Sequence, residues 1–280
     1  MRAEKRRGPL VGYWGKPMNG RLPGVTTAIA ALVTGAALGI AGARTASAAD
    51  PACNDATSPV THNISGSIDV EEGTQCHLNG FTIGGSVYVE DGAKLFARNG
   101  TVVHGSISAT NPQQLNIEKS THIYGSLSVN GTPAGGFGGF LCGSIVGGSV
   151  SLTNLTSGRW VIGEPSDPNQ EGGTYEGYDY NGGGNYDQDL TCESPNWIGG
   201  SVTFTGSDDV NGLELAFNTI KGSVSITNND VVDEAIEVES NSIGSALACS
   251  GNDWDTGSTP VTNGGQTNWA KTKTGQCSGL

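Results

Sequence analysis

The sequence VHGSISA at Val103–Ala109 returns twenty residues later as IYGSLSV at Ile123–Val129. Both stretches follow one pattern, apolar-x-Gly-Ser-apolar-x-apolar, which we call the rung motif. Further copies have their glycine at Gly66, Gly85, Gly148, Gly200 and Gly222, and a degenerate copy has Ser245 in that place. Successive copies are 19 to 23 residues apart, except for one step of 52 residues that ends at Gly200. Apolar residues at every second position predict strands, and a period near twenty predicts that these strands stack as a solenoid.

A second alternating run lies between most copies of the motif, as Cys76-x-Leu78, Leu95-x-Ala97, Leu115-x-Ile117, Leu213-x-Leu215 and Ile236-x-Val238. Each turn is therefore predicted to supply at least two short strands. One turn alone cannot bury its apolar face, so neighbouring turns must stack. We expect an all-β parallel β-helix of about eight coils over residues 64–249, with one long inserted loop and ends closed by disulfides.

Corner residues give finer expectations. The recurrent glycine is predicted to point inward, where a side chain would crowd the corner, and to need a positive φ. Asn218 and Asn241 each lie two residues before a copy of the motif. They are predicted to stack as corner asparagines, since Asn tolerates the left-handed conformation. The serines of the motif, such as Ser223 and Ser225, are expected to form outward hydroxyl rows.

The first 49 residues are expected to be a signal peptide. A basic leader precedes an uncharged stretch from Val25 to Ala43, and Ala46-Ser-Ala48 is a small-x-small cleavage pattern. An uncleaved anchor is the alternative, because the stretch is about long enough to span a membrane. From residue 50 onward the chain has 7 basic and 26 acidic residues, a net charge of −19. That charge argues against nucleic acid and anionic lipid as partners.

Six cysteines follow the leader: Cys53, Cys76, Cys142, Cys192, Cys249 and Cys277. An even number after a signal peptide predicts disulfides in an oxidising, extracellular compartment. Six cysteines allow 15 pairings; we expect the sequential one. It would fasten an N-terminal cap (residues 50–63) and a C-terminal cap (residues 250–280) over strand edges that a solenoid leaves unpaired.

The rung motif and the ending LACSGN at Leu247–Asn252 resemble uncharacterised secreted actinobacterial β-helix proteins. More distantly, the chain is similar to the right-handed β-helix class that includes the pectate lyases. The resemblance implies the fold and export. It carries over no catalytic residue, because the arginine and calcium-carboxylate set of the lyases has no match in this sequence.

The 52-residue step implies an excursion of roughly thirty residues near 160–197, if one coil takes about twenty. It is rich in acids and aromatics, and long loops on rigid scaffolds often carry function. Aromatic rings stack on the C–H faces of sugars while carboxylates accept hydroxyl hydrogen bonds. The candidate ligand-binding residues are Trp160, Tyr175, Tyr178, Tyr180, Tyr186 and Trp197. The plain alternative is a solvated loop.

Within the excursion, the sequence from Gly182 to Leu190 partly resembles the calcium-binding nonapeptide of β-roll proteins. A single calcium ion on Asp187 and Asp189 is the one cofactor that this would support. Other candidate groups are an outward ladder of Glu214, Glu237 and Glu239, suited in spacing to glycoside hydrolysis, and the adjacent His104 and Tyr124. For both groups, surface decoration is the preferred interpretation, because neither has a partner at a diagnostic spacing.

These observations favour a secreted, non-enzymatic scaffold or surface-associated protein whose partner is a polysaccharide or cell-surface glycan. The alternative is a polysaccharide lyase or glycoside hydrolase. A third is a structural protein that assembles end to end.

Overall fold

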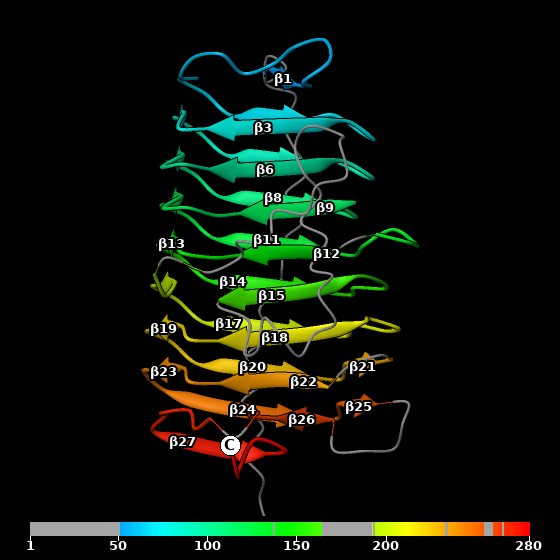
Figure 1. Ribbon diagram of the computed structural model, residues 1–280, viewed down its shortest axis with the longest axis vertical. Coiled ribbons are helices and arrows are strands. Elements are labelled where there is room, and N and C mark those ends of the chain that lie inside the picture. Colours follow the sequence, from blue (N-terminus) through cyan, green and yellow to red (C-terminus); the bar gives the residue numbers. More distant parts are fainter. Residues whose placement is uncertain are drawn as a thin grey trace, which may run out of the picture. The chain divides into compact units, whose positions relative to one another are not determined.

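The computed structural model describes residues 51–136, 138–163, 192, 194–232, 235–254, 260–264 and 266–280. Over these ranges the chain forms an all-β parallel solenoid of about seven turns, which confirms the predicted fold class. Figure 1 shows the turns stacked in chain order, from β3 near one end to β27 at the other. No helix within these ranges is long and apolar enough to cross a membrane.

The largest sheet has ten strands within the described residues and takes the second half of each rung motif. Its strands pair in parallel, so Val150 lies opposite Leu127 on one side and Val202 on the other. In order, they are β1 (Ala52–Cys53), β2 (Ile68–Val70), β5 (Val87–Val89), β8 (Ile107–Thr110), β11 (Leu127–Asn130), β14 (Val150–Thr153), β17 (Val202–Thr205), β20 (Val224–Thr227), β24 (Ala246–Ser250) and β27 (Thr272–Gly275).

The second alternating run of each turn forms an eight-stranded sheet. It comprises β3 (Gln75–Asn79), β6 (Lys94–Arg98), β9 (Gln114–Ile117), β12 (Gly138–Leu141), β15 (Arg159–Gly163), β18 (Gly212–Ala216), β22 (Ile236–Glu239) and β26 (Val261–Thr262). The start of each rung motif forms a third sheet of seven two-residue strands. These are β4 (Thr82–Ile83), β7 (Val102–Val103), β10 (His122–Ile123), β13 (Ile145–Val146), β16 (Trp197–Ile198), β19 (Thr219–Ile220) and β23 (Ser242–Ile243).

The segment expected to be a C-terminal cap adds strands to the stack. In it, β25 (Asp253–Trp254) pairs with β21 (Asp230–Val231), β26 pairs with β22, and β27 pairs with β24. At the other end, β1 of the predicted N-terminal cap pairs with β2. The parallel ladder therefore extends beyond residues 64–249 in both directions.

The interior is a set of apolar columns, because every second strand residue points inward and the register is kept from turn to turn. Trp160 belongs to one of these columns and is 3% exposed. Its indole occupies space left by Gly139 of the preceding turn, where an added Cβ would lie 2.3 Å from the ring. The pair explains why this sheet departs here from its usual Leu-x-Leu pattern.

The motif glycines are required by close packing between turns, not by their φ angles. A Cβ on Gly125 would lie 2.3 Å from Ser106 Oγ and 2.6 Å from the carbonyl oxygen of Gly105. The same crowding recurs at Gly105, Gly148, Gly200 and Gly222. The expectation of a positive φ at these glycines is wrong, because none of them is among the residues with positive φ.

Corner asparagines stack as predicted, but in another backbone conformation. Asn218 Nδ2 donates to Asn241 Oδ1 at 2.9 Å and to the main-chain oxygen of Ile162 at 2.8 Å. The left-handed residues are their predecessors, Phe217 (φ 55°) and Ser240 (φ 50°). The amide row runs from Asn196 through Asn218 and Asn241 to Asn268.

Earlier turns place hydroxyl residues at the same corner. Thr101 and Thr121 donate from Oγ1 to main-chain oxygens of the preceding turn, at 2.8 Å and 3.1 Å. Ser144 connects the two kinds of corner, since its N–H donates to Asn196 Oδ1 at 2.8 Å. The corner chemistry therefore changes from hydroxyl to amide at the turn that is followed by the 52-residue step.

The motif serines form their own ladder on the ten-stranded side. The N–H of Ser126 donates to Ser106 Oγ at 3.0 Å, and the N–H of Ser149 donates to Ser126 Oγ at 3.1 Å. The first serine of each motif is thus used between turns. The second lies on the outer strand face, where Ser128 is exposed and Ser108, Ser151 and Ser225 are half-buried.

The predicted sequential disulfides are confirmed as Cys53–Cys76, Cys142–Cys192 and Cys249–Cys277. Three disulfides are typical of proteins in an oxidising compartment. The middle bond ties the end of the excursion to the turn before it, and Cys192 packs against a small cluster that contains Phe140 and Val161.

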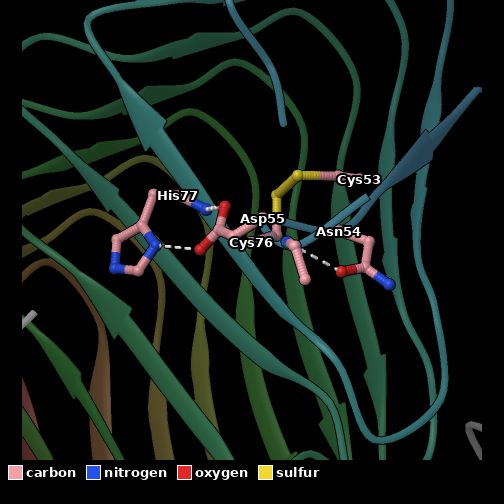
Figure 2. A network of polar contacts seen from close by, with 6 residues as sticks. Cys53, Asn54, Asp55, Cys76 and His77 are labelled. Carbon is pink, nitrogen blue, oxygen red and sulfur yellow. Dashed lines mark hydrogen bonds and ion pairs between the residues drawn. A yellow bond between two sulfur atoms is a disulfide. The ribbon is translucent and has the colours of Figure 1, made fainter. Parts of the chain in front are cut away.

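A polar network beside the first disulfide fixes the N-terminal segment (Figure 2). The carboxylate of Asp55 accepts a hydrogen bond from the backbone N–H of His77 at 3.1 Å and also contacts Nδ1 of its ring. The ring stacks on Phe96, with centroids 4.7 Å apart. Burial lowers the pKa of His77, while Asp55 acts in the opposite direction. We assign this network a structural role in closing the first turn.

Candidate functional site: an aromatic face on the seven-stranded sheet

The outer face of the seven-stranded sheet presents two rows of side chains, because each strand contributes its first residue and the residue after its second. The first row is Thr82, Val102, His122, Ile145, Trp197, Thr219 and Ser242. The second row is Gly84, His104, Tyr124, Gly147, Gly199, Lys221 and Gly244. A bridge from Ser242 to Trp269 extends the first row by one turn, and the exposed Lys271 follows next to the second row, because its N–H donates to the main-chain oxygen of Ser245, at the motif-glycine position.

All of the exposed large hydrophobic side chains in the described part of the chain lie on this face. Tyr124 is 53% exposed, Ile145 42%, Trp197 38% and Trp269 60%. Tyr124, Ile145 and Trp197 come from three consecutive turns, spaced by ~4.8 Å each. Trp269 lies three turns beyond Trp197, or ~14 Å along the axis. We call the two rows together the aromatic face.

Histidines hold the tyrosine ring in place. The ring of Tyr124 stacks on His122 of the same turn, with centroids 4.0 Å apart, and on His104 of the preceding turn, with centroids 5.0 Å apart and planes within 3°. Stacked rings of this kind are mutually attractive and restrict one another's rotamers. The three rings therefore form a rigid, partly exposed aromatic surface.

Glycine gives the tryptophan ring room to lie along the sheet. A Cβ on Gly199 would lie 2.9 Å from two atoms of the Trp197 ring, so the indole lies over this glycine of its own turn. The same Cβ would lie 2.2 Å from the main-chain oxygen of Gly147, so close approach of the turns also requires glycine here. A large aromatic surface is thus presented outward, and contiguous exposed apolar surface of this kind marks interaction sites.

The residues expected to bind a ligand are divided by the structure. Trp197 lies on the aromatic face, whereas the buried Trp160 is a core residue whose ring is not available to a ligand. The tyrosines Tyr175, Tyr178, Tyr180 and Tyr186 and the calcium candidates Asp187 and Asp189 lie outside the described residues. Within the described ranges, no group of three or more His, Cys, Asp or Glu side chains could hold a metal ion.

The glutamate ladder is present on the outer face of the eight-stranded sheet. Glu214 lies opposite Glu237 on adjacent turns and accepts a hydrogen bond from Arg159 at 3.1 Å. Glu239 lies two residues after Glu237 on β22 and is 1% exposed, and neither of its carboxylate oxygens has a hydrogen-bond partner among the described residues. Burial, and secondarily the charge of Glu237, raises the pKa of Glu239 to about 7.

Sequence reasoning missed Ile145, Trp269 and the continuity of the aromatic face. The signal was the residue before each rung motif, which reads His122, Ile145 and Trp197 once the motif copies across the 52-residue step are treated as neighbours. Trp269 gave no such signal, because it lies in a part of the chain without the motif.

Comparison with protein-family models, with curated proteins and with solved structures found no match for this chain.

Proposed function

We propose that this protein is a secreted, non-enzymatic β-helix that binds polysaccharide through the aromatic face. One observation carries the proposal: the exposed large apolar side chains of the described residues gather on one narrow sheet. Rings at axial intervals suit an extended chain of sugar units, because each ring can stack on the C–H face of one unit. We propose with it that the chain is related to secreted actinobacterial β-helix proteins and, more distantly, to the pectate-lyase class.

Ring removal tests the proposal. Tyr124→Ala, Trp197→Ala and Trp269→Ala should each weaken binding of the mature protein on a glycan array, by roughly three- to tenfold for each lost stacking contact. Tyr88→Ala is the matched control, because Tyr88 lies on the outer face of the ten-stranded sheet. Equal affinity of all three variants and the parent would contradict the proposed surface.

A deletion separates the aromatic face from the excursion. Removal of 172–184 takes away Tyr175, Tyr178 and Tyr180 but keeps every cysteine. Loop shortening changes closure entropy slowly, so the variant should melt within a few degrees of the parent. Retained binding would place recognition on the aromatic face, and lost binding would place it in the excursion. Calcium should be tested in the same assay, because Asp187 and Asp189 remain in the variant.

Secretion has its own test. Mass spectrometry of the exported protein should find a chain that starts at Ala49 or Asp50 and has no reduced thiol. An intact leader would contradict the predicted signal peptide.

The second candidate function is glycoside hydrolysis at the glutamate ladder. It is favoured by neighbouring carboxyl groups in different environments: Glu239 has a pKa raised to about 7, while Glu214 is paired with Arg159. Such a pair can divide the roles of acid and base. We place this candidate second because the buried side chain of Glu239 is not accessible to a substrate. Release of reducing ends by the parent, abolished in Glu239→Gln, would establish it.

A further inference from the structure

The aromatic face has a charge opposite to that of the rest of the chain. None of the two rows' side chains, nor Trp269 or Lys271 on the next turn, is an aspartate or glutamate. The chain has 26 acidic residues from position 50 onward. The rows contain Lys221 and two of the four histidines of the chain, His104 and His122, and Lys271 lies beside them on the last turn; both lysines are exposed.

The lysines lie beside the tryptophans. Lys221 follows Gly199 in the second row, one turn after Trp197, and the two turns pair directly through Trp197 and Thr219. Lys271 lies two residues after Trp269 on the outer side of the last turn. Each indole therefore has an ammonium group on its own turn or the next. An indole can stack on the face of a sugar ring while the nearby ammonium group binds a substituent at the edge of that sugar. This pair of side chains occurs twice along the axis.

Charge complementarity makes this arrangement selective. A neutral glycan can accept hydrogen bonds from the two ammonium groups but gains no charge attraction, and it is not repelled by carboxylates, so it does not account for a face without acids. An anionic chain is repelled by the other surfaces and attracted to this one, since complementary potentials steer association and suppress wrong partners. Specificity of this kind depends on excluded like charges as much as on contacts.

We infer that the ligand of the aromatic face is an anionic polysaccharide, in which sugar rings stack on Trp197 and Trp269 while carboxylate or sulfate groups bind Lys221 and Lys271. The inference rests on the proposed function and names its ligand class.

Two charge-matched pairs of polymers test the inference with the mature protein. Polygalacturonate is compared with its fully methyl-esterified form, and dextran sulfate with dextran, by isothermal titration calorimetry. We expect the charged member of at least one pair to bind about tenfold more tightly than its neutral partner. The pair that shows the difference identifies carboxylate or sulfate as the group recognised. Raising the salt concentration should remove the difference, because exposed charge pairs are screened.

The double variant Lys221→Gln/Lys271→Gln should lose about tenfold in affinity for the charged polymer, consistent with two exposed ion pairs. Its affinity for the neutral polymer should not change. The matched control is Lys94→Gln, a lysine of the eight-stranded sheet. Circular dichroism melts of the variants check that the fold is kept.

The outcomes distinguish this inference from the proposed function. Equal binding of charged and neutral polymers, still lost in Trp197→Ala, would overturn the inference and leave polysaccharide binding in place. Absence of binding to every polymer would overturn both. Single-stranded DNA that bound as tightly as the charged glycans, with the same dependence on Lys221 and Lys271, would also overturn the inference, because nucleic acid would then be the better partner.

Discussion

Glu239→Gln should make the protein more stable at neutral and alkaline pH. The side chain of Glu239 is 1% exposed at the end of β22, and in the described part of the chain its two carboxylate oxygens have no hydrogen-bond partner. Glu237 lies two residues before it on the same strand, and Ala216 of the preceding turn lies opposite it. Glu214, with its partner Arg159, lies opposite Glu237. Gly264 of the following turn also packs against it.

The sign of the effect follows from the pKa. Burial, then Glu237, raises the pKa of Glu239 from 4.5 to about 7 in the folded state. Below pH 4.5 the carboxyl is protonated in both the folded and the unfolded state, so its ionisation does not lower the free energy of unfolding. Between pH 4.5 and 7 the Glu239 carboxyl is ionised in the unfolded chain but still largely protonated in the folded protein. The parent therefore loses stability as the pH rises through this range. Above 7 the loss is complete, with an upper bound of about 3 kcal/mol for a shift of this size.

Chemical denaturation at pH 4.5, 6 and 8 measures the prediction. The difference in unfolding free energy between Glu239→Gln and the parent should be near zero at pH 4.5 and grow to its full value at pH 8. In a domain of this size, each kcal/mol corresponds to roughly 2–4 °C in Tm. The control is Glu90→Gln, at an exposed corner, which should show no such growth. A constant difference across the three pH values would refute the argument.

Two further substitutions test the packing of the solenoid. Val224→Asp places a carboxylate in an interior column and should cost several kcal/mol, whereas Ser225→Asp, which points outward on the same strand, should cost little; thermal melts that rank them the other way would show that the strand register is wrong by one residue. Asn241→Ala leaves the main-chain oxygen of Leu215 without its amide donor and should lower the free energy of unfolding, measured by urea denaturation, by about 2–4 kcal/mol. The control Asn79→Ala removes an exposed side chain and should lower it by less than about 1 kcal/mol.

The fold was predictable because every level of the sequence points the same way. Period-2 alternation assigned inward residues such as Ile107 and Leu127, and the nearly constant step between motifs made them neighbours. The pairing of the cysteines near the two ends was predicted from the need to cover the unpaired strand edges of the stack. Trp160 was misplaced because its large ring hides the pattern Trp160-x-Ile162, which aligns with Leu213-x-Leu215 of the next turn. Only the packing against Gly139 shows that an indole fits inside.

The candidate site was less accessible to sequence reasoning. Tyr124 and Ile145 are separated from Trp197 by the 52-residue step, and solvent exposure depends on which face each short strand presents. The absence of acids on that face appears only when both rows are assembled from seven separate tripeptides. The predicted stacking of Asn218 on Asn241 succeeded because it required a single repeat length.

The change of corner chemistry gives the two halves of the stack different cooperativity. From Asn196 to Asn268 each amide donates to the next in one direction, so their dipoles add along the axis and polarise one another, as in a chain of hydrogen-bonded amides. The threonine corners donate only to main-chain oxygens and form no such relay. Because a repeat protein can open at its weakest interface, native-state hydrogen exchange should resolve two protection classes. The more slowly exchanging class should begin at Trp197 and include β18, β19 and β22.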